Sequence, residues 1–189
     1  MKYILIIMVF AFSFSSCDSD YPVVRIDEFS LEQGGYIRTV TPFPVLAATF
    51  SVKKADLAGS KWEFVGEAVT PNSGGNFASY EMLVRFVDAT PANGTNNVAD
   101  KAFKIYQASS FVKDPTTGYP RLTMGSTGRD LATAVGLADN LISVGDRFEV
   151  VATMVLSDGR KFTLTNTGPD ITGGAFYSSP FFYRVNVLQ

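Results

Sequence analysis

The side chains that could do acid–base chemistry in this sequence are carboxylates, because the chain contains no histidine. Its absence excludes Ser-His-Asp and Cys-His catalysis and histidine-ligated zinc. A facing pair of carboxylates could still serve as the acid and base of a glycosidase. The candidates are Glu63, Glu67, Glu81, Asp88 and Asp170. The first three fall on strand faces opposite the larger apolar stripes, where a solvated surface is the simpler interpretation. No spacing among the five requires a catalytic pair, so we expect a protein that is not an enzyme.

Loop oxygens offer a second kind of chemistry, the binding of calcium, in segments 88–100 and 166–170. Neither segment matches the D-x-[DN]-x-[DN]-G pattern of a calcium loop. Turn-forming Asp and Asn side chains explain both segments equally well. The glycine motifs that cradle phosphates and dinucleotides are also missing from the sequence. We therefore expect no metal and no cofactor.

Aromatic rings are the remaining candidates, since flat rings can stack on the faces of sugars. Trp62 is the only tryptophan, Tyr119 lies in a Gly-Tyr-Pro loop, and Tyr177 lies in a loop rich in Gly and Ser. Loops both expose rings and carry function, so we predict a glycan-binding role for these three residues. The alternative is that Trp62, together with Tyr106 on a predicted strand, belongs to the core, where such rings are common.

The only cysteine, Cys17, follows a short apolar run that begins after Lys2. A positive charge, an apolar stretch and small residues are the layout of a secretory signal, and the run is too short to span a bilayer comfortably. An N-terminal core helix is the alternative. Ser15-Ser16-Cys17 resembles a bacterial lipobox, in which the cysteine is acylated and becomes the first residue. Each buried CH₂ of an acyl chain adds about 0.8 kcal/mol of membrane affinity, so Cys17 is the predicted membrane anchor.

The mature chain would lose residues 1–16 and keep 173 of the 189 residues, with a formal charge of −3 instead of −2. This mildly acidic balance provides no basic face, so nucleic acid is not an expected partner. Hydrophobic residues make up 46% of the chain and charged residues 18%, which argues against disorder. An acylated Cys17 leaves no thiol for a disulfide, so stability must come from a core.

Period-two alternation dominates the rest of the chain and predicts β-strands. It is clear in segments 61–68, 80–87, 147–156 and 181–187, and Asp158-Gly159 is a strong hairpin signal. One segment, 129–137, has helical spacing instead. We predict a lipidated tether over 17–33. Residues 34–189 are predicted to form a single domain, an immunoglobulin-like antiparallel β-sandwich of about nine strands with one short helix.

Two sets of motifs resemble a known group of proteins. Asp18 and Asp20, directly after Cys17, resemble the acidic tract of surface-exported Bacteroidota lipoproteins. Five stretches resemble small lipoproteins of starch-utilisation-type (SusE/SusF-like) glycan-uptake systems: GGYIRTV, VRFVDATPANGT, PRLTMGSTGRDLATAVGL, VGDRFEV with LSDGRKFT, and TGGAFYSSPFFYRVNV.

The resemblance implies an outer-membrane lipoprotein that faces the cell exterior. Such a protein would be a non-catalytic accessory or glycan-binding component, with a polysaccharide ligand and a transporter complex as partners. The alternative is a structural lipoprotein that binds an outer-membrane protein without binding glycan.

Overall fold

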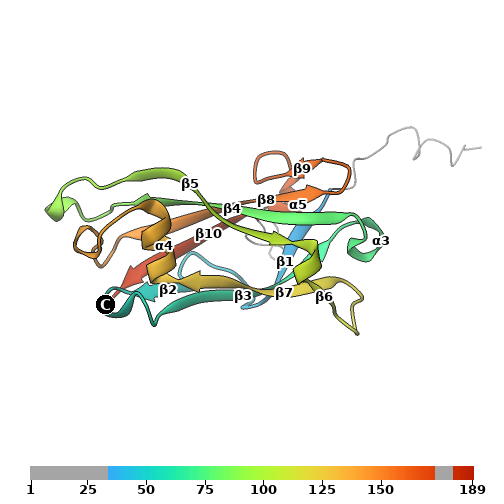
Figure 1. The fold of residues 1–189 in the computed structure, drawn as a ribbon, viewed down its shortest axis with the longest axis horizontal. Coiled ribbons are helices and arrows are strands. Elements are labelled where there is room, and N and C mark those ends of the chain that lie inside the picture. Colours follow the sequence, from blue (N-terminus) through green and yellow to red (C-terminus); the bar gives the residue numbers. More distant parts are fainter. Residues whose placement is uncertain (1–33, 173–180) are drawn as a thin grey trace, which may run out of the picture. The chain divides into compact units, whose positions relative to one another are not determined.

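The computed structural model describes residues 34–172 and 181–189 (Figure 1). These residues fall within one compact unit, Gln33–Gln189. The predicted signal peptide, the lipidation site Cys17, the tether over 17–33 and Tyr177 all lie outside the described residues. The structure does not test the predictions for these residues.

The smaller sheet has four antiparallel strands in the order β1-β3-β7-β6. Alternation in β3 sends Trp62 and Phe64 inward, both 1% exposed, and leaves Glu63 at the surface. Because side chains alternate across a strand, one face of this sheet is apolar and the other is polar. The strands are β1 (Tyr36–Thr41), β3 (Lys61–Val69), β6 (Val112–Lys113) and β7 (Pro120–Thr127).

The larger sheet has six strands, five of them in the order β2-β10-β8-β4-β5, with β9 paired to β8. Its pairs are antiparallel except for β10 and β2, which run parallel. The strands are β2 (Phe50–Lys53), β4 (Phe77–Val87), β5 (Val98–Gln107), β8 (Arg147–Leu156), β9 (Lys161–Phe162) and β10 (Phe182–Leu188).

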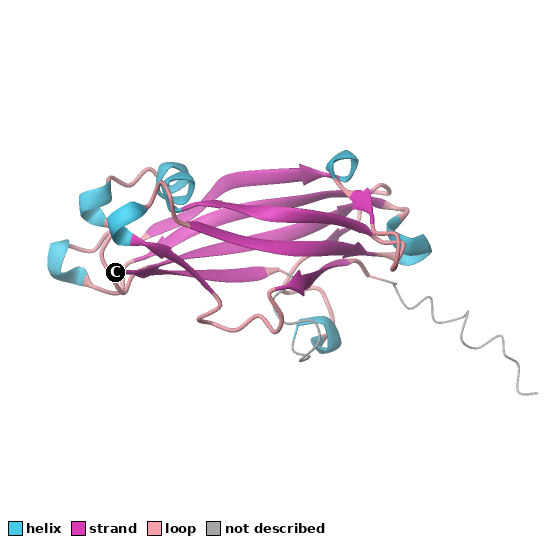
Figure 2. Ribbon diagram, turned by 90° about the horizontal axis from the view of Figure 1, so that it is seen from below, coloured by secondary structure: helices cyan, strands magenta, loops and turns pink. Residues whose placement is uncertain are grey.

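Helix α4 (Gly128–Val135) is held at its start by a capping box between Thr127 and Asp130. It ends at Gly136, whose φ of 71° is left-handed and suits glycine. The predicted helix over 129–137 is thus confirmed, one residue earlier at its start. Figure 2 shows the helical segments around the margins of the sheets. The shorter ones are α3 (Pro71–Gly74), α5 (Pro169–Thr172) and single 3₁₀ turns at Lys54–Asp56, Pro91–Asn93, Ala108–Ser110 and Asp139–Leu141.

The core lies between the two sheets. Phe50 and Tyr183 of the larger sheet contact Trp62 and Phe64 of the smaller one, with ring centroids 4.6–6.2 Å apart. Aromatic pairs at such distances stabilise beyond the area that they bury. Trp62 Nε1 donates a hydrogen bond of 2.9 Å to Ser126 Oγ, so its polar atom is satisfied inside the core.

The prediction of an all-β sandwich is confirmed, with ten strands instead of about nine in the described residues. The parallel β2–β10 pair departs from the purely antiparallel arrangement that was expected. Within residues 34–172 and 181–189, no helix has the length and apolar character needed to cross a bilayer.

Candidate functional site

Three charged residues form a row across the outer face of the smaller sheet. In the strand register, Glu67 of β3 lies opposite Arg38 of β1 on one side and Arg121 of β7 on the other. Directly opposed side chains of neighbouring strands are close enough to interact. Glu67 was expected on a solvated face, and this expectation is wrong. The residue is on the predicted face, but it is 0% exposed because the two arginines and Thr117 enclose it.

The Glu67 carboxylate accepts five hydrogen bonds. Its Oε2 accepts from Nε of Arg38 at 3.1 Å and from Nη2 of the same residue. Its Oε1 accepts from the Thr117 hydroxyl at 2.6 Å, and from Nε (3.1 Å) and Nη2 of Arg121. Burial alone would raise the pKa of Glu67, but the hydrogen bonds from Thr117, Arg38 and Arg121 outweigh it and leave the pKa below its ordinary value.

Asp114 organises the loop that covers this row. Arg121 Nη1 lies 2.7 Å from Asp114 Oδ2, and Asp114 Oδ1 accepts from the backbone N–H groups of Thr116 (3.1 Å) and Thr117 (2.9 Å). The Thr117 bond is the main cause that lowers the pKa of Asp114. Such an Asx turn is typical of aspartate. The Asp114 N–H also donates to the Tyr119 carbonyl at 3.0 Å, which closes the loop.

Two aromatic rings stand at the margin of the row. The Tyr119 ring centroid lies 5.7 Å from Arg38 Cζ, a cation–π contact. Phe43 is 51% exposed and stands between Pro42 and Pro44. Proline has no N–H for a ladder, which accounts for the end of β1 at Thr41 and lets the chain carry Phe43 outward. The Phe43 and Tyr119 rings therefore both lie beside the charged row.

The row and the Phe43 ring border a pocket of about 350 Å³. This volume lies at the lower end of the range for small-molecule sites. Its wall combines apolar surface from Val40 and Phe43 with guanidinium, carboxylate and hydroxyl groups. The lining residues are Arg38, Thr39, Val40, Phe43, Glu67, Thr117 and Arg121. We call this the Glu67 pocket.

The Glu67 pocket is suited to holding a ligand rather than to moving protons. A carboxyl that acts as general acid in a glycosidase needs a raised pKa, whereas the pKa of Glu67 is lowered. The nearest other carboxylate in the network, Asp114, is bound to the same arginine, Arg121, and its pKa is lowered as well. Both carboxylates thus serve to fix guanidinium and hydroxyl groups in place.

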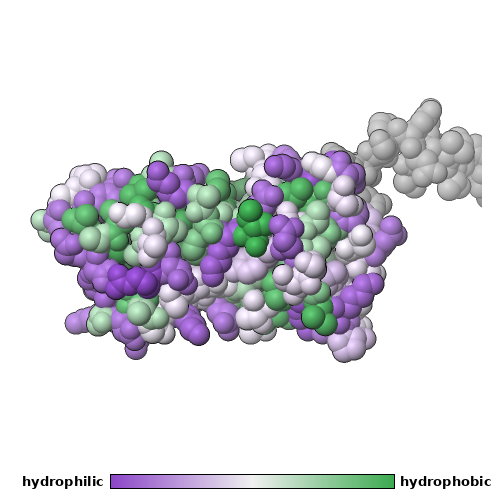
Figure 3. Space-filling view, viewed as in Figure 1, coloured by the Kyte–Doolittle hydropathy of each residue, from purple (hydrophilic) through white to green (hydrophobic). Residues whose placement is uncertain are grey.

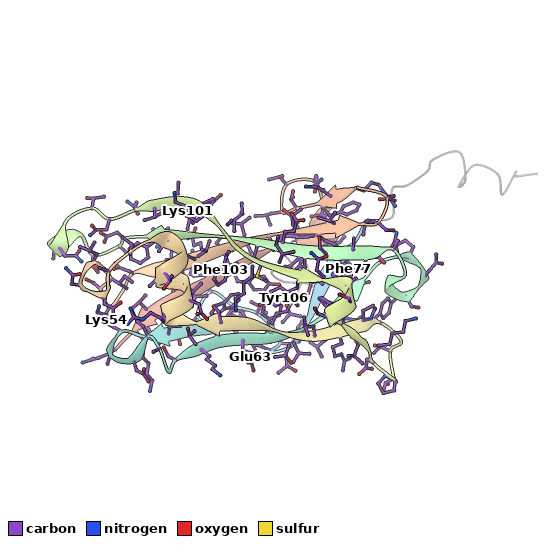
Figure 4. All side chains as sticks on the ribbon, in the orientation of Figure 1. Lys54, Glu63, Phe77, Lys101, Phe103 and Tyr106 are labelled. Atoms are coloured by element: carbon purple, nitrogen blue, oxygen red, sulfur yellow. The ribbon has the colours of Figure 1, made fainter. Side chains whose placement is uncertain are left out.

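The two predicted glycan-binding residues that the structure describes, Trp62 and Tyr119, are not brought together. Trp62 is 1% exposed and hydrogen-bonded in the core, so its ring cannot meet a sugar face, and its prediction as a glycan-binding residue is corrected. Tyr119 lies half-buried beside the Glu67 pocket. Tyr106 is half-buried on β5 (labelled in Figure 4), and its hydroxyl bonds to the Gly125 carbonyl at 3.1 Å.

The other candidate carboxylates are dispersed. Glu63 is exposed on β3 (Figure 4) and Glu81 is half-buried on β4, in different sheets. Asp88 accepts from the backbone N–H groups of Thr90 (3.0 Å) and Asn96 (2.9 Å), as expected of a turn residue. The side chain of Asp170 is outside the described part. Among the described residues, no group of three or more potential ligands could hold a metal ion.

Sequence reasoning missed six of the seven residues of the pocket wall, all except Glu67: Arg38, Thr39, Val40, Phe43, Thr117 and Arg121. Alternation indicated that Glu67 points outward, but the register that aligns it with both arginines depends on pairing between distant segments. A usable signal for Phe43 was its position between two prolines, which keeps a large apolar residue out of the sheet.

Comparison with known proteins adds no relative at this point. No protein-family model matches the chain, and a search of curated proteins found no match. The function is therefore argued from the site itself.

Proposed function

We propose that this chain is an outer-membrane surface lipoprotein whose domain binds glycan, without cleaving it, at the Glu67 pocket. In this proposal Cys17 is the lipid-anchored residue and the protein serves a polysaccharide-uptake system. The observation that carries the binding role is the pocket wall, where the exposed Phe43 ring stands beside the fixed polar groups of Arg38, Glu67 and Thr117.

The chemistry of sugars supports this assignment. A pyranose has apolar C–H faces that pack on rings and apolar walls, and hydroxyl groups that need hydrogen-bond partners. The pocket offers Phe43 and Val40 for the former and the polar atoms of Arg38 and Thr117 for the latter. Because buried polar groups are costly when unpaired, prearranged partners favour a hydroxyl-rich ligand over a purely apolar one.

Electrostatic balance in the pocket favours a neutral sugar. The charges of Arg38 and Arg121 are matched by those of Glu67 and Asp114, and each pair is in direct contact. A strongly charged ligand would have to compete with these contacts. The domain is thus expected to take a neutral glycan segment, one or two sugars in length, consistent with the pocket volume of about 350 Å³.

Affinity electrophoresis tests the proposal directly. The protein would be run through native gels that contain amylopectin, laminarin, xylan, galactomannan or polygalacturonate. We expect retardation by at least one of the neutral polysaccharides and none by polygalacturonate. Unchanged mobility in all five gels would reject the glycan-binding role and leave the structural alternative.

A further inference from the structure

Arg184, on β10, is half-buried, and its charge has no partner among the described residues. Its Nε is buried and makes no hydrogen bond, and no ion pair joins Arg184 to any residue in the part of the chain that the structure describes. A buried donor without an acceptor is unfavourable. Buried polar groups without a partner are rare in folded proteins, so Arg184 marks a place to look for a second binding site.

The carboxylate that lies opposite Arg184 is already occupied. Glu149 of β8 lies opposite Arg184 in the register, but its Oε2 accepts from Arg85 Nε at 2.8 Å and its Oε1 from Arg147 Nε at 2.7 Å. Glu149 is 5% exposed beneath these arginines. Arg85 and Arg147 thus occupy both oxygens of Glu149, and Asp100 lies 3.9 Å from Arg85. With Arg184, this group has three arginines and two carboxylates. This part of the outer face carries excess positive charge.

Apolar surface adjoins Arg184. With Val45, Leu46, Ala47 and Phe182 it lines a pocket of about 170 Å³, which we call the Arg184 pocket. Leu46 is 65% exposed. Apart from Arg184, every lining side chain is apolar, so a bound molecule would meet one guanidinium and a hydrocarbon wall.

The apolar surface continues across the larger sheet. Phe182 lies opposite Val151, Val151 opposite Leu83, and Leu83 opposite Ala102, which makes one row over β10, β8, β4 and β5. A charged row of Arg184, Glu149 and Arg85 runs beside it, two residues away on each strand, because these residues follow the same registers. Figure 3 views the two stacked sheets from the side and shows apolar and polar patches interspersed along the half of the molecule where β4 and β5 run.

We propose that the Arg184 pocket binds a carboxylate carried on an apolar group, presented by a segment of a protein partner. The carboxylate would accept from Arg184, and the apolar group would enter between Leu46 and Phe182. Arginine suits this role because its planar guanidinium pairs with a carboxylate in a bidentate manner. The apolar row beyond Phe182 would extend the contact along the partner.

A protein segment fits this surface better than an acidic sugar. The wall of the Arg184 pocket offers hydroxyl groups no polar side chain other than Arg184 itself. A sugar would lose its hydrogen bonds with water there without replacement, which is unfavourable. An apolar side chain next to a carboxylate has no such loss. The proposal is independent of glycan binding, because the Glu67 pocket lies on the other sheet.

The test uses small probes and the full chain, purified in detergent and labelled with ¹⁵N. N-acetylphenylalanine carries a carboxylate beside an apolar group, N-acetylphenylalaninamide is its neutral match, and glucuronate is the acidic sugar. We expect N-acetylphenylalanine to shift the backbone amide signals of Leu46, Ala47 and Phe182 in a saturable manner. The affinity of the amide should be lower by about tenfold or more, because the amide cannot form the charge-assisted pair with Arg184.

Two variants complete the test. Arg184→Met should weaken binding of N-acetylphenylalanine about tenfold or more, whereas Arg160→Met, which removes a half-buried arginine paired with Asp158, should leave it unchanged. Arg184→Met should melt at the same temperature as the parent or higher, because it removes a buried donor without a partner. Equal binding of acid and amide, no saturable shift, or full binding by Arg184→Met would overturn the proposal. Tighter binding of glucuronate would replace the protein segment with an acidic sugar.

Discussion

Arg121 joins the two carboxylates that organise the Glu67 pocket. Its Nε donates to Glu67 Oε1 at 3.1 Å, and its Nη1 lies 2.7 Å from Asp114 Oδ2. One side chain of β7 therefore connects the neighbouring inner strand, β3, to the loop that carries Thr117 and Tyr119. This connection holds the pocket wall in place. Substitutions in the wall should therefore change the stability of the protein and its binding of glycan, and the two effects can be measured separately.

Replacing Glu67 by glutamine should destabilise the protein. The glutamine keeps the shape but removes the charge that Arg38 and Arg121 surround, and it places an amide N–H₂ against guanidinium donors. We expect a loss of about 2–3 kcal/mol in the free energy of unfolding, measured by urea denaturation. The matched control is Glu63→Gln on the same strand face, which is exposed and should change stability by less than about 0.5 kcal/mol. Equal effects of the two changes would contradict this account of Glu67.

Acidification should remove the same contribution. The pKa of Glu67 is lowered in the folded protein from an ordinary value of 4.5. Its stabilising effect is therefore complete above that ordinary value and is lost as the pH falls through the folded pKa. The difference in unfolding free energy between the parent and Glu67→Gln should be constant near neutral pH and shrink below about pH 4.5. A difference that grows on acidification would mean that Glu67 is protonated in the fold.

Replacing Trp62 by phenylalanine should affect the core and not the binding of glycan. The change removes the indole N–H that donates to Ser126 and leaves a gap beside Phe50. We expect the free energy of unfolding, measured with urea or heat, to fall by about 1–3 kcal/mol. Retardation of the folded variant in a polysaccharide gel should equal that of the parent. Loss of gel retardation without a loss of stability would show that Trp62 takes part in glycan binding.

Replacing Cys17 by serine tests the predicted anchor. We expect the variant to lose metabolic labelling by a fatty-acid analogue and to leave the membrane fraction, because serine provides no thiol for acylation. Asp18→Asn is the matched control, since it alters the neighbouring residue and keeps the thiol. Labelling that survives in Cys17→Ser would contradict the lipobox assignment.

Local sequence patterns were enough to predict the strands. They could not predict contacts between residues that are far apart along the chain. Alternation around Trp62 and Phe64 placed both on the face opposite Glu63, which was already a signal that the tryptophan is buried. The environment of Glu67 could not be predicted in this way, because Arg38 is 29 and Arg121 is 54 residues away along the chain. A change of register by one residue would send these side chains to opposite faces.

The same limit applies to Arg184. The sequence shows it on a strand whose alternate residues, such as Tyr183 and Val185, face the core, and so predicts an outward position. Its isolation depends on Arg85 and Arg147 occupying Glu149. That arrangement arises only when β4, β8 and β10 are paired.

Calorimetric titration of a retained neutral polysaccharide into three variants tests glycan binding at the Glu67 pocket most directly. Phe43→Ala and Tyr119→Ala remove the two rings at the pocket, and Ile105→Ala removes an exposed apolar side chain (61%, against 51% for Phe43) from the larger sheet. We predict that each ring variant weakens binding about fivefold to tenfold or more, since a stacked ring contributes on the order of 1 kcal/mol or more. Ile105→Ala should bind like the parent. Parental affinity in both ring variants would contradict the assignment of glycan binding to the Glu67 pocket.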